Sequence, residues 1–472
     1  MKLRDRALLE VIYAAGLRVS EVRDLNVNDI NFGNEGASRS REGLEAASRP
    51  YRRSGAPSAV PYLHEVTSVR PDDQPPELAE LTLFDEIGPL GDCLADFEDG
   101  RINVFGGIPG ERVVARIVRY RRRRKRMVSG IVQDVVTASP HRVSAPCQYF
   151  GACTGCQWQH VSYNHQLALK RGYVERNFSE YPSLSGTNIE PCIPAPSLYG
   201  YRNHARYTIR REGSPGFVNR ITRRFVQTDE CLLMTPGINR LADGLKGRAQ
   251  ETSQLSIRYG VNTDDWLIQP TLKSEQIFRW SPGRVTTPRK LLGRTFRIAS
   301  PSFFQVNTEQ AERLAELVGR TLELSGRELV VDAYAGVGTF AILLADSVNR
   351  VVAIEESAAA VRGCAANASG IENVEFIEGK TEDVLDSMQA RPDAVILDRH
   401  GPGCHPTVLE ALIRLAPERT VYVSCDPEAL ARDLDVLVRG GFRIESVRPI
   451  DMFPQTHHVE TVALLEGVSR KY

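Results

Sequence analysis

The stretch LVVDAYAGVGTFAILLA, residues Leu329–Ala345, decides the fold of the C-terminal part of this 472-residue chain. An apolar run ending at Asp332 predicts a strand, the glycines of Ala-Gly-Val-Gly predict a tight turn, and the residues from Phe340 predict a helix. Glycines let a backbone approach a ligand closely, and helix N-termini offer free N–H groups. Glu355 ends the next expected strand about 20 residues later, where an acid can accept hydrogen bonds from ribose hydroxyls. The pattern fits NAD or S-adenosylmethionine, and the lack of a third glycine favours S-adenosylmethionine.

Beyond this stretch, apolar runs of strand length alternate with helical patterns to the end of the chain. The runs are VVAIEE, VEFIEG, AVILD and TVYVSC. Such alternation is typical of βαβ units, so the sequence predicts a doubly wound α/β domain with a mostly parallel sheet over residues 326–472.

Upstream of this domain, the pattern changes three times. Residues 139–325 mix strand and helix signals and predict an α+β central region. Residues 77–138 hold short alternating segments such as LTLFDEI and ERVVARIV, punctuated by Gly and Pro, which predict a small OB-like β-barrel of about five strands. Residues 34–76 are rich in Ser, Arg, Gly, Pro and Ala, the composition of a disordered linker.

Composition excludes several classes of protein. The longest apolar runs are far shorter than the roughly 20 residues that span a bilayer, so no membrane association is expected. No basic segment followed by an apolar one opens the chain, so we expect a cytoplasmic protein with reduced cysteines. The 59 cations balance the 59 anions, yet seven cations fall within the eight residues from Arg119 to Arg126. That run fits a phosphate-binding surface or an ordinary solvated loop.

Three cysteines lie within ten residues, in the spacing Cys147-x5-Cys153-x2-Cys156. In a reduced chain such thiols can surround one soft metal centre, either zinc or an iron–sulfur cluster. Spacing alone leaves the fourth ligand open between Cys192 and Cys231.

The segment CQYFGACTGCQWQHVSYNHQLALK, which begins at Cys147, resembles the iron–sulfur segment of the TRAM-containing RNA uracil-5-methyltransferases. The likeness runs from about residue 77 to residue 472. It implies a TRAM domain at 77–138, a central domain at 139–325, and a class I methyltransferase domain that uses S-adenosylmethionine at 326–472. It also implies an RNA substrate, with 23S rRNA favoured over tRNA, and gives no indication of a protein partner. The resemblance assigns a [4Fe–4S] cluster to Cys147, Cys153, Cys156 and Cys231.

The same resemblance assigns the methyl-donor site. Family members contact S-adenosylmethionine through the glutamine of an F-F-Q-V-N segment, an aromatic residue in the glycine-rich turn, and acids after the second and fourth strands. These positions are Gln305, Tyr334, Glu355 and Asp398 here.

Cys425 follows an expected strand and precedes a helix, a placement that suits an inert thiol as well as a reactive one. The motif Ser-Cys-Asp-Pro at 424–427 resembles the family's nucleophile motif, which makes Cys425 the nucleophile. DMFPQTHHVE at 451–460 resembles the segment that carries the family's general base, which falls on Glu460. The implied reaction adds a thiolate to uracil C6, methylates C5, and then removes the C5 proton.

One segment departs from the family. Where the family has D-P-P-R-x-G-C, this chain reads DRHGPGC at 398–404, so both prolines and the arginine are lost from their places. A catalytically impaired RNA-binding homologue is therefore one alternative interpretation, and a tRNA uracil-5-methyltransferase is another.

Residues 1–33 resemble a different family. RDRALLEVIYAAGLRVSEVRDLNVNDINF is similar to the first catalytic segment of Xer-type tyrosine recombinases, in which the residue at the position of Arg18 binds the scissile phosphate. The later recombinase motifs have no match, so we interpret 1–33 as a fragment without recombinase activity.

Overall fold

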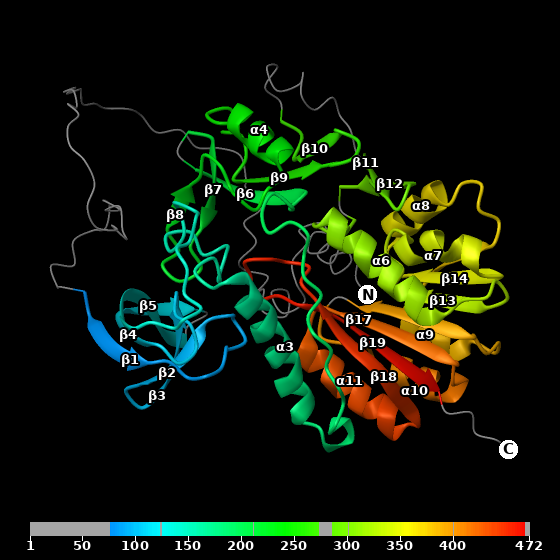
Figure 1. Ribbon diagram of the computed structural model, residues 1–472. Coiled ribbons are helices and arrows are strands. Elements are labelled where there is room, and N and C mark those ends of the chain that lie inside the picture. The colour runs from blue at the N-terminus through cyan, green and yellow to red at the C-terminus, as the bar shows by residue number, and fades with distance from the viewer. Residues whose placement is uncertain are drawn as a thin grey trace.

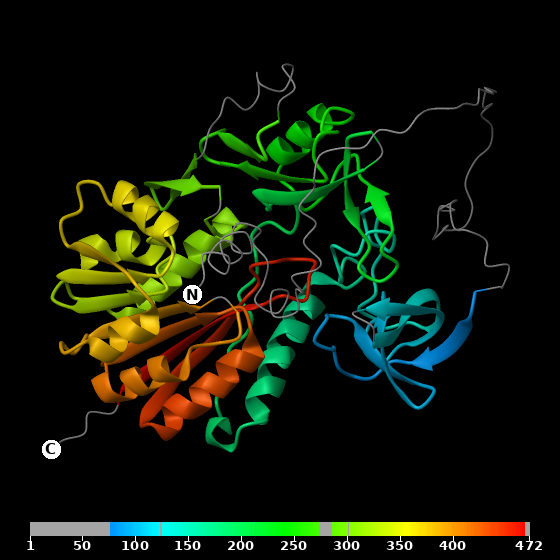
Figure 2. The ribbon, with the colours of Figure 1, turned by 180° about the vertical axis from the view of Figure 1, so that it is seen from behind.

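The computed structural model describes residues 76–467, except 123, 124, 211, 273–285, 301 and 400. The expected recombinase-like fragment and almost all of the expected linker therefore lie outside the described residues. Figures 1 and 2 show a small sheet, a central region and a larger sheet covered by helices. Within the ranges that the structure describes, none of the helices combines the length and the apolar character needed to cross a bilayer.

The first part is a five-stranded sheet in the order β1-β4-β5-β3-β2. Its strands are β1 (Leu78–Thr82), β2 (Cys93–Phe97), β3 (Gly100–Phe105), β4 (Arg112–Arg122) and β5 (Lys125–Thr137). The N–H of Phe84, just after β1, donates to the carbonyl of Leu94 in β2 at 2.9 Å, so the two edge strands adjoin. Val113 and Ala115 alternate with more exposed residues of β4 and are fully buried, because successive side chains of a strand face opposite sides.

The central region begins with helix α3 (Tyr163–Ser179) and the short 3-10 helix η2 (Pro182–Leu184). An antiparallel sheet follows in the order β10-β9-β6-β7-β8. Its strands are β6 (His204–Arg210), β7 (Ser214–Val218), β8 (Phe225–Gln227), β9 (Gln254–Tyr259) and β10 (Trp266–Gln269). Helix α4 (Pro236–Gly244) packs Ile238 and Leu241 on one face of this sheet. A hairpin of β11 (Thr286–Leu291) and β12 (Arg294–Ala299) leads to the last part.

The last part is a seven-stranded sheet in the order β15-β14-β13-β16-β17-β19-β18. The strands are β13 (Leu329–Ala333), β14 (Arg350–Glu355), β15 (Val374–Glu378), β16 (Ala394–Arg399), β17 (Arg419–Ser424), β18 (Phe442–Ile450) and β19 (Glu460–Gly467). The first five positions in the sheet are parallel, whereas β19 pairs antiparallel with both β17 and β18. The predicted mostly parallel sheet is confirmed.

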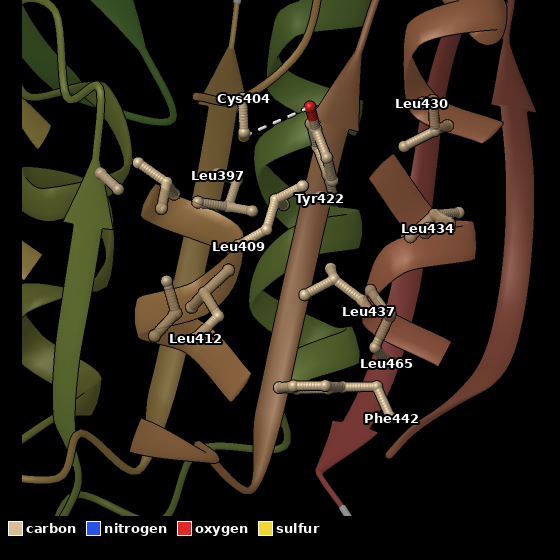
Figure 3. Close-up of a cluster of buried hydrophobic side chains, with 14 of the residues drawn as sticks. Leu397, Cys404, Leu409, Leu412, Tyr422, Leu430, Leu434, Leu437, Phe442 and Leu465 are labelled. Carbon is tan, nitrogen blue, oxygen red and sulfur yellow. Dashed lines mark hydrogen bonds between the residues drawn. The ribbon is translucent and has the colours of Figure 1, made fainter. Parts of the chain in front are cut away.

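Helices cover both faces of this sheet (Figure 1). They are α6 (Thr308–Leu322), α7 (Thr339–Leu344), η3 (Ala345–Ser347), α8 (Ala358–Asn367), α9 (Thr381–Ser387), α10 (Pro406–Leu415) and α11 (Pro427–Arg439). Val331 faces the core beneath α10 and α11, and its neighbour Val330 faces the core beneath α6 and α7. Figure 3 shows the first core, where leucines of α10 and α11 pack against Leu397 and Tyr422. Since both faces are covered, the central strands β13, β16 and β17 consist mainly of buried apolar residues.

Candidate functional site

The predicted site residues of the large sheet gather at one of its edges. Tyr334 follows β13, Glu355 ends β14, Asp398 is the penultimate residue of β16, and Cys425 follows β17. These strands are parallel, so all four positions lie at their carboxyl ends. Glu460 opens the antiparallel strand β19 and therefore lies at the same edge. In open α/β sheets this edge is where ligands bind.

Cys425 and Glu460 flank the last residue pair of two adjacent strands. That pair is Ser424 of β17 and Thr461 of β19; Cys425 directly follows the first residue and Glu460 directly precedes the second. Both residues therefore lie at the same edge of the sheet. Cys425 is half-buried and the Glu460 side chain is 4% exposed. A partly buried thiol and a buried carboxyl group thus lie near the ends of adjacent strands.

The N-terminus of α11 lies directly after this thiol. Asp426 caps the helix, and its side chain accepts a hydrogen bond from the Ala429 N–H at 3.2 Å. Ser424 Oγ bridges the backbone N–H and carbonyl of Asp426, at 3.1 Å each, which fixes the turn around Cys425. A helix N-terminus favours negative charge nearby, so this placement suits a thiolate.

The glycine-rich turn after β13 is held by two acids. Gly336 has φ +58° and Gly338 has φ +78°, in the left-handed region that favours glycine. The Glu355 carboxylate accepts hydrogen bonds from the Gly336 N–H (2.9 Å) and the Ser357 N–H (2.7 Å). Asp332 Oδ2 accepts one from the Ala341 N–H (2.9 Å). Glu355 therefore positions the turn in addition to the predicted role beside a ribose.

Asp332 was missed as a site residue, although it ends the strand that decides the fold. It is fully buried, and burial raises its pKa to about 8, with the nearby charges of Asp398 and Glu355 acting in the same direction. The three acids therefore form one electrostatic group under the turn. The sequence feature that could have identified Asp332 is its place, as the acid at the end of the apolar run before the glycine-rich turn.

Gln305 lies between β12 and α6, in a segment tied to two other parts of the chain. Asn203 Nδ2 donates to the Gln305 carbonyl at 3.1 Å, and Asn307 Nδ2 donates to the Met452 carbonyl at 3.2 Å. Gln305 Oε1 is buried and makes no hydrogen bond to the protein in the part of the chain that the structure describes. A bound cofactor can satisfy such an atom, so the residues here fit S-adenosylmethionine.

The segment that departs from the family still places a cation at the site. The Arg399 guanidinium lies over the Tyr334 ring, 4.9 Å from its centroid, and Arg399 Nε donates to the Gly403 carbonyl at 3.2 Å. Downstream, the Cys404 N–H donates to Asp433 Oδ2 at 2.6 Å, and the Cys404 thiol lies 3.3 Å from the Tyr422 hydroxyl. A dashed line in Figure 3 marks the contact between Cys404 and Tyr422. A cation–π contact of this kind is worth about 0.5–1 kcal/mol at exposed sites and more when desolvated. The altered sequence thus keeps an anchored loop.

Residues 451–459, which lead to Glu460, are held from three sides. Lys170 of α3 forms a fully buried ion pair with Asp451 and donates to the Phe453 carbonyl at 3.1 Å. Gln310 of α6 donates to the Asp451 carbonyl at 2.9 Å. A Cβ atom added to Gly91, in the turn between β1 and β2, would lie 2.4 Å from the His457 side chain. The approach to Glu460 therefore depends on α3, on α6 and on the N-terminal sheet.

Four of the predicted cysteines line one cavity of about 170 Å³ in the central region. They are Cys147, Cys153, Cys156 and Cys231. The other lining side chains are mainly apolar or aromatic, and burial raises the pKa of Cys153 to about 11 and that of Cys156 to about 12. Cys192 does not line this cavity, and its charge neighbours are Lys170 and Asp451. No group of three or more His, Cys, Asp or Glu that could hold a metal ion is found within the described ranges.

The basic run falls at the tip of the β4–β5 hairpin. Arg121, Lys125 and Arg126 are exposed there. Arg119 is instead paired with Glu77 (2.8 Å) and Glu98 (2.6 Å), so its charge is neutralised within the sheet. The positive surface that this hairpin can offer to a phosphate is thus smaller than the seven cations of the sequence indicate.

Comparison with known proteins agrees with this arrangement. Residues 289–468 match the model of the tRNA (Uracil-5-)-methyltransferase family. The chain is 35% identical over 433 residues to an uncharacterized RNA methyltransferase of Gloeobacter violaceus, covering 80% of this chain and 94% of the relative. It is 32% identical to one of Thermotoga maritima, covering 79% and 96%.

A solved structure shares the fold over most of the chain. It is the Pyrococcus abyssi tRNA (uracil-54, C5)-methyltransferase in complex with S-adenosyl-L-homocysteine, with a TM-score of 0.65 and 24% identity over 82% of this chain and 100% of that one. The chain belongs to the RNA uracil-5-methyltransferase family and is an S-adenosylmethionine-dependent class I enzyme.

Proposed function

We propose that the chain methylates C5 of a uridine in 23S rRNA through a covalent bond between Cys425 and uracil C6. The observation that carries the proposal is that Cys425 and Glu460 flank the last residue pair of the adjacent strands β17 and β19, Ser424 and Thr461, at the ligand-binding edge of the sheet. A nucleophile and a base at the same edge of the sheet suit a ring that must be attacked at C6 and deprotonated at the adjacent carbon.

The chain's own residues perform the steps around methyl transfer. The Cys425 thiolate, favoured by the N-terminus of α11, adds to C6 and turns the ring into an enolate with electron density on C5. Bound S-adenosylmethionine supplies the methyl group that C5 takes up. Glu460 then accepts the C5 proton, the C5–C6 double bond re-forms, and the C6–S bond breaks to release Cys425. The target base must leave its stack to reach this edge.

Four residues would hold the methyl donor: Gln305, Tyr334, Glu355 and Asp398. The support is the edge of the sheet shared by Tyr334, Glu355 and Asp398, and the buried Gln305 Oε1, which has no hydrogen-bond partner among the described residues. The acids beside the glycine-rich turn add to it. Arg399, stacked on Tyr334, would close the site from the side of the altered loop.

We assign the sheet at 77–138 as a TRAM domain, and Cys147, Cys153, Cys156 and Cys231 as the ligands of a [4Fe–4S] cluster. The support for the cluster is that these four thiols, the donors that a soft metal centre prefers, line one cavity with largely apolar walls; as they stand, the described residues do not group them closely enough to hold a metal ion. A cluster bound by these thiols would link the segment after β8, which carries Cys231, to the segment before α3, which carries the other three cysteines. Such a link would make this part of the fold more rigid. Iron and sulfide analysis of anaerobically purified protein, with Cys153→Ser as the comparison, tests the assignment, and a metal-free wild-type protein would refute it.

A second candidate is tRNA uracil-5-methylation. It is favoured by the match of 289–468 to a tRNA methyltransferase model and by the likeness of the whole described fold to a tRNA enzyme. Transfer of a labelled methyl group to unmodified 23S rRNA and to tRNA transcripts separates the two. Methylation of tRNA alone would overturn the rRNA assignment, and methylation of neither would support an impaired RNA-binding homologue.

Substitutions at the two reactive groups test the covalent step. Cys425→Ala and Cys425→Ser should both abolish methylation, while Cys93→Ala, a buried cysteine of the N-terminal sheet, should leave it intact. Glu460→Gln should trap a denaturant-stable protein–RNA complex, because the methylated adduct cannot lose its C5 proton. Methylation that persists in Cys425→Ala would refute the nucleophile assignment.

A further inference from the structure

One face of the central sheet collects positive charge. His204 and Arg206 alternate along β6, and Arg258 of β9 pairs directly with His204. The intervening residues, Ala205 and Ile257, point into the core on the other face. Arg289 reaches this face from β11, where its Nη2 donates to the Asn203 carbonyl at 3.2 Å. We call His204, Arg206, Arg258 and Arg289 the arginine face.

In the part of the chain that the structure describes, the buried arginines of this face lack the carboxylate partners that buried cations normally have. Arg289 is 3% exposed, and its Nε and Nη1 are buried with no hydrogen-bond partner among the described residues. Arg258 is also buried, and within the described ranges the charges that act on the pKa values of Arg258 and Arg289 come from other arginines, not from a carboxylate. Arg142, by contrast, is matched by the buried carboxylate of Glu111.

Burying unpaired guanidinium groups together is unfavourable. Burial lowers the pKa of Arg258 to about 10, and nearby Arg206 acts in the same direction. Burial likewise lowers the pKa of Arg289 to about 9, with Arg258 adding to the effect. A singly or doubly charged oxyanion bound here would offset the unfavourable burial of the Arg258 and Arg289 guanidinium groups, because several of their N–H donors can converge on its oxygens.

The arginine face adjoins the predicted donor-binding segment. The Arg289 guanidinium lies 5.8 Å from the centroid of the Phe304 ring, and Asn203, which accepts from Arg289, donates to the Gln305 carbonyl. Phe303, in the same segment, is 49% exposed. Exposed aromatic rings beside phosphate-binding cations are typical of surfaces that bind unpaired nucleotides.

We propose that the arginine face is a binding site for a backbone phosphate of the RNA substrate, close to the methylated uridine. Arg206, which is exposed, meets the phosphate first, and the buried Arg258 and Arg289 form the base of the site. The proposal rests on the RNA substrate of the proposed function and adds the place where its backbone is gripped.

The test is the salt dependence of RNA binding by the full chain, with a uridine-containing hairpin as the probe. Arg206→Gln should weaken binding roughly tenfold and lower the slope of log K against log salt by about 0.7–0.9, the loss of one phosphate contact. Arg289→Met should lower the slope of log K against log salt by the same amount as Arg206→Gln. This expectation holds for the folded variant, regardless of any change in its melting temperature. Arg240→Gln, an exposed arginine of α4 on the other side of the sheet, is the matched control and should change neither quantity.

Three results would overturn the proposal. One is an unchanged slope in folded Arg206→Gln, and another is an equal change in Arg240→Gln. The third is a weaker affinity for S-adenosylhomocysteine in Arg206→Gln with normal RNA binding, which would assign the face to the donor. Inorganic phosphate should compete with RNA in the wild type more than chloride does at the same ionic strength. Cys425→Ser, which should stop methylation, should keep the wild-type salt slope, so a failure of the chemistry and a failure of this site are distinguishable.

Discussion

The buried ion pair between Lys170 and Asp451 yields a quantitative prediction. Both side chains are fully buried, and Lys170 Nζ also donates to the Phe453 carbonyl. Lys170→Met keeps the length of the side chain but leaves the Asp451 carboxylate without its cation. Breaking a buried pair from one side costs roughly 3–5 kcal/mol, a large part of the 5–15 kcal/mol that stabilises a typical domain. In a domain of roughly 150–250 residues each 1 kcal/mol shifts the melting temperature by about 2–4 °C, so we expect Lys170→Met to lower the melting temperature by roughly 6–20 °C.

Urea unfolding is the assay, followed by circular dichroism and by tryptophan fluorescence. Trp158 is a local probe, because Lys170 Nζ lies 5.9 Å from its ring centroid. The matched control is Lys246→Met, whose partners Asp229 and Asp243 are largely exposed and whose pairing should be worth at most about 1 kcal/mol. The double variant Lys170→Met with Asp451→Asn should be less destabilised than the sum of its parts, since the uncompensated charge is gone. A loss in Lys170→Met no larger than in Lys246→Met would refute the reasoning.

Three further predictions concern other buried features. Burial holds the pKa of Asp332 at about 8, above its unfolded value, so its contribution to stability is complete at acidic pH and is lost as the pH rises toward 8. The unfolding free energy of the wild type should therefore fall between pH 5 and pH 8, and that of Asp332→Asn should depend less on pH in denaturant titrations. Asp433→Ala should cost roughly 2–4 kcal/mol in the same measurement, because the Tyr422 hydroxyl and the Cys404 N–H lose their acceptor, and a cost below 1 kcal/mol would contradict this. Gly91→Ala should lower the melting temperature more than Gly186→Ala does, since both glycines have positive φ but only Gly91 packs against another side chain; equal losses would contradict the packing argument.

The large sheet could be predicted from the sequence because its strands are buried on both faces. Apolar runs such as LVVDA and AVILD, bounded by glycine and acids, leave little choice of secondary structure. The antiparallel insertion of β19 between β17 and β18 could not be predicted, because strand order and direction depend on tertiary pairing. That insertion is what brings Glu460 to the edge that carries Cys425.

The site was predictable where a motif is local and unpredictable where distant residues meet. Spacing could not assign Cys231 as the fourth ligand, because Cys192 is closer in sequence to the other three. In the fold, Cys231 lines the cavity while Cys192 lies near Lys170. Arg258 and Arg289 appear as ordinary alternating polar residues of strands in the sequence. Their burial without a carboxylate becomes visible only when β6, β9 and β11 are assembled.

The segment 451–459 sets a limit on how this enzyme can be divided. Gln166 of α3 exchanges two hydrogen bonds of 3.0 Å with Gln455, one to its side chain and one to its backbone N–H. A fragment cut at residue 289, where the family match begins, would retain Glu460 but lose Gln166, Lys170 and Gly91. Chimeras that exchange the N-terminal half between relatives would replace the residues that contact segment 451–459, and so would put the same contacts at risk. The smallest unit worth transplanting is therefore the whole span from the first strand to the last.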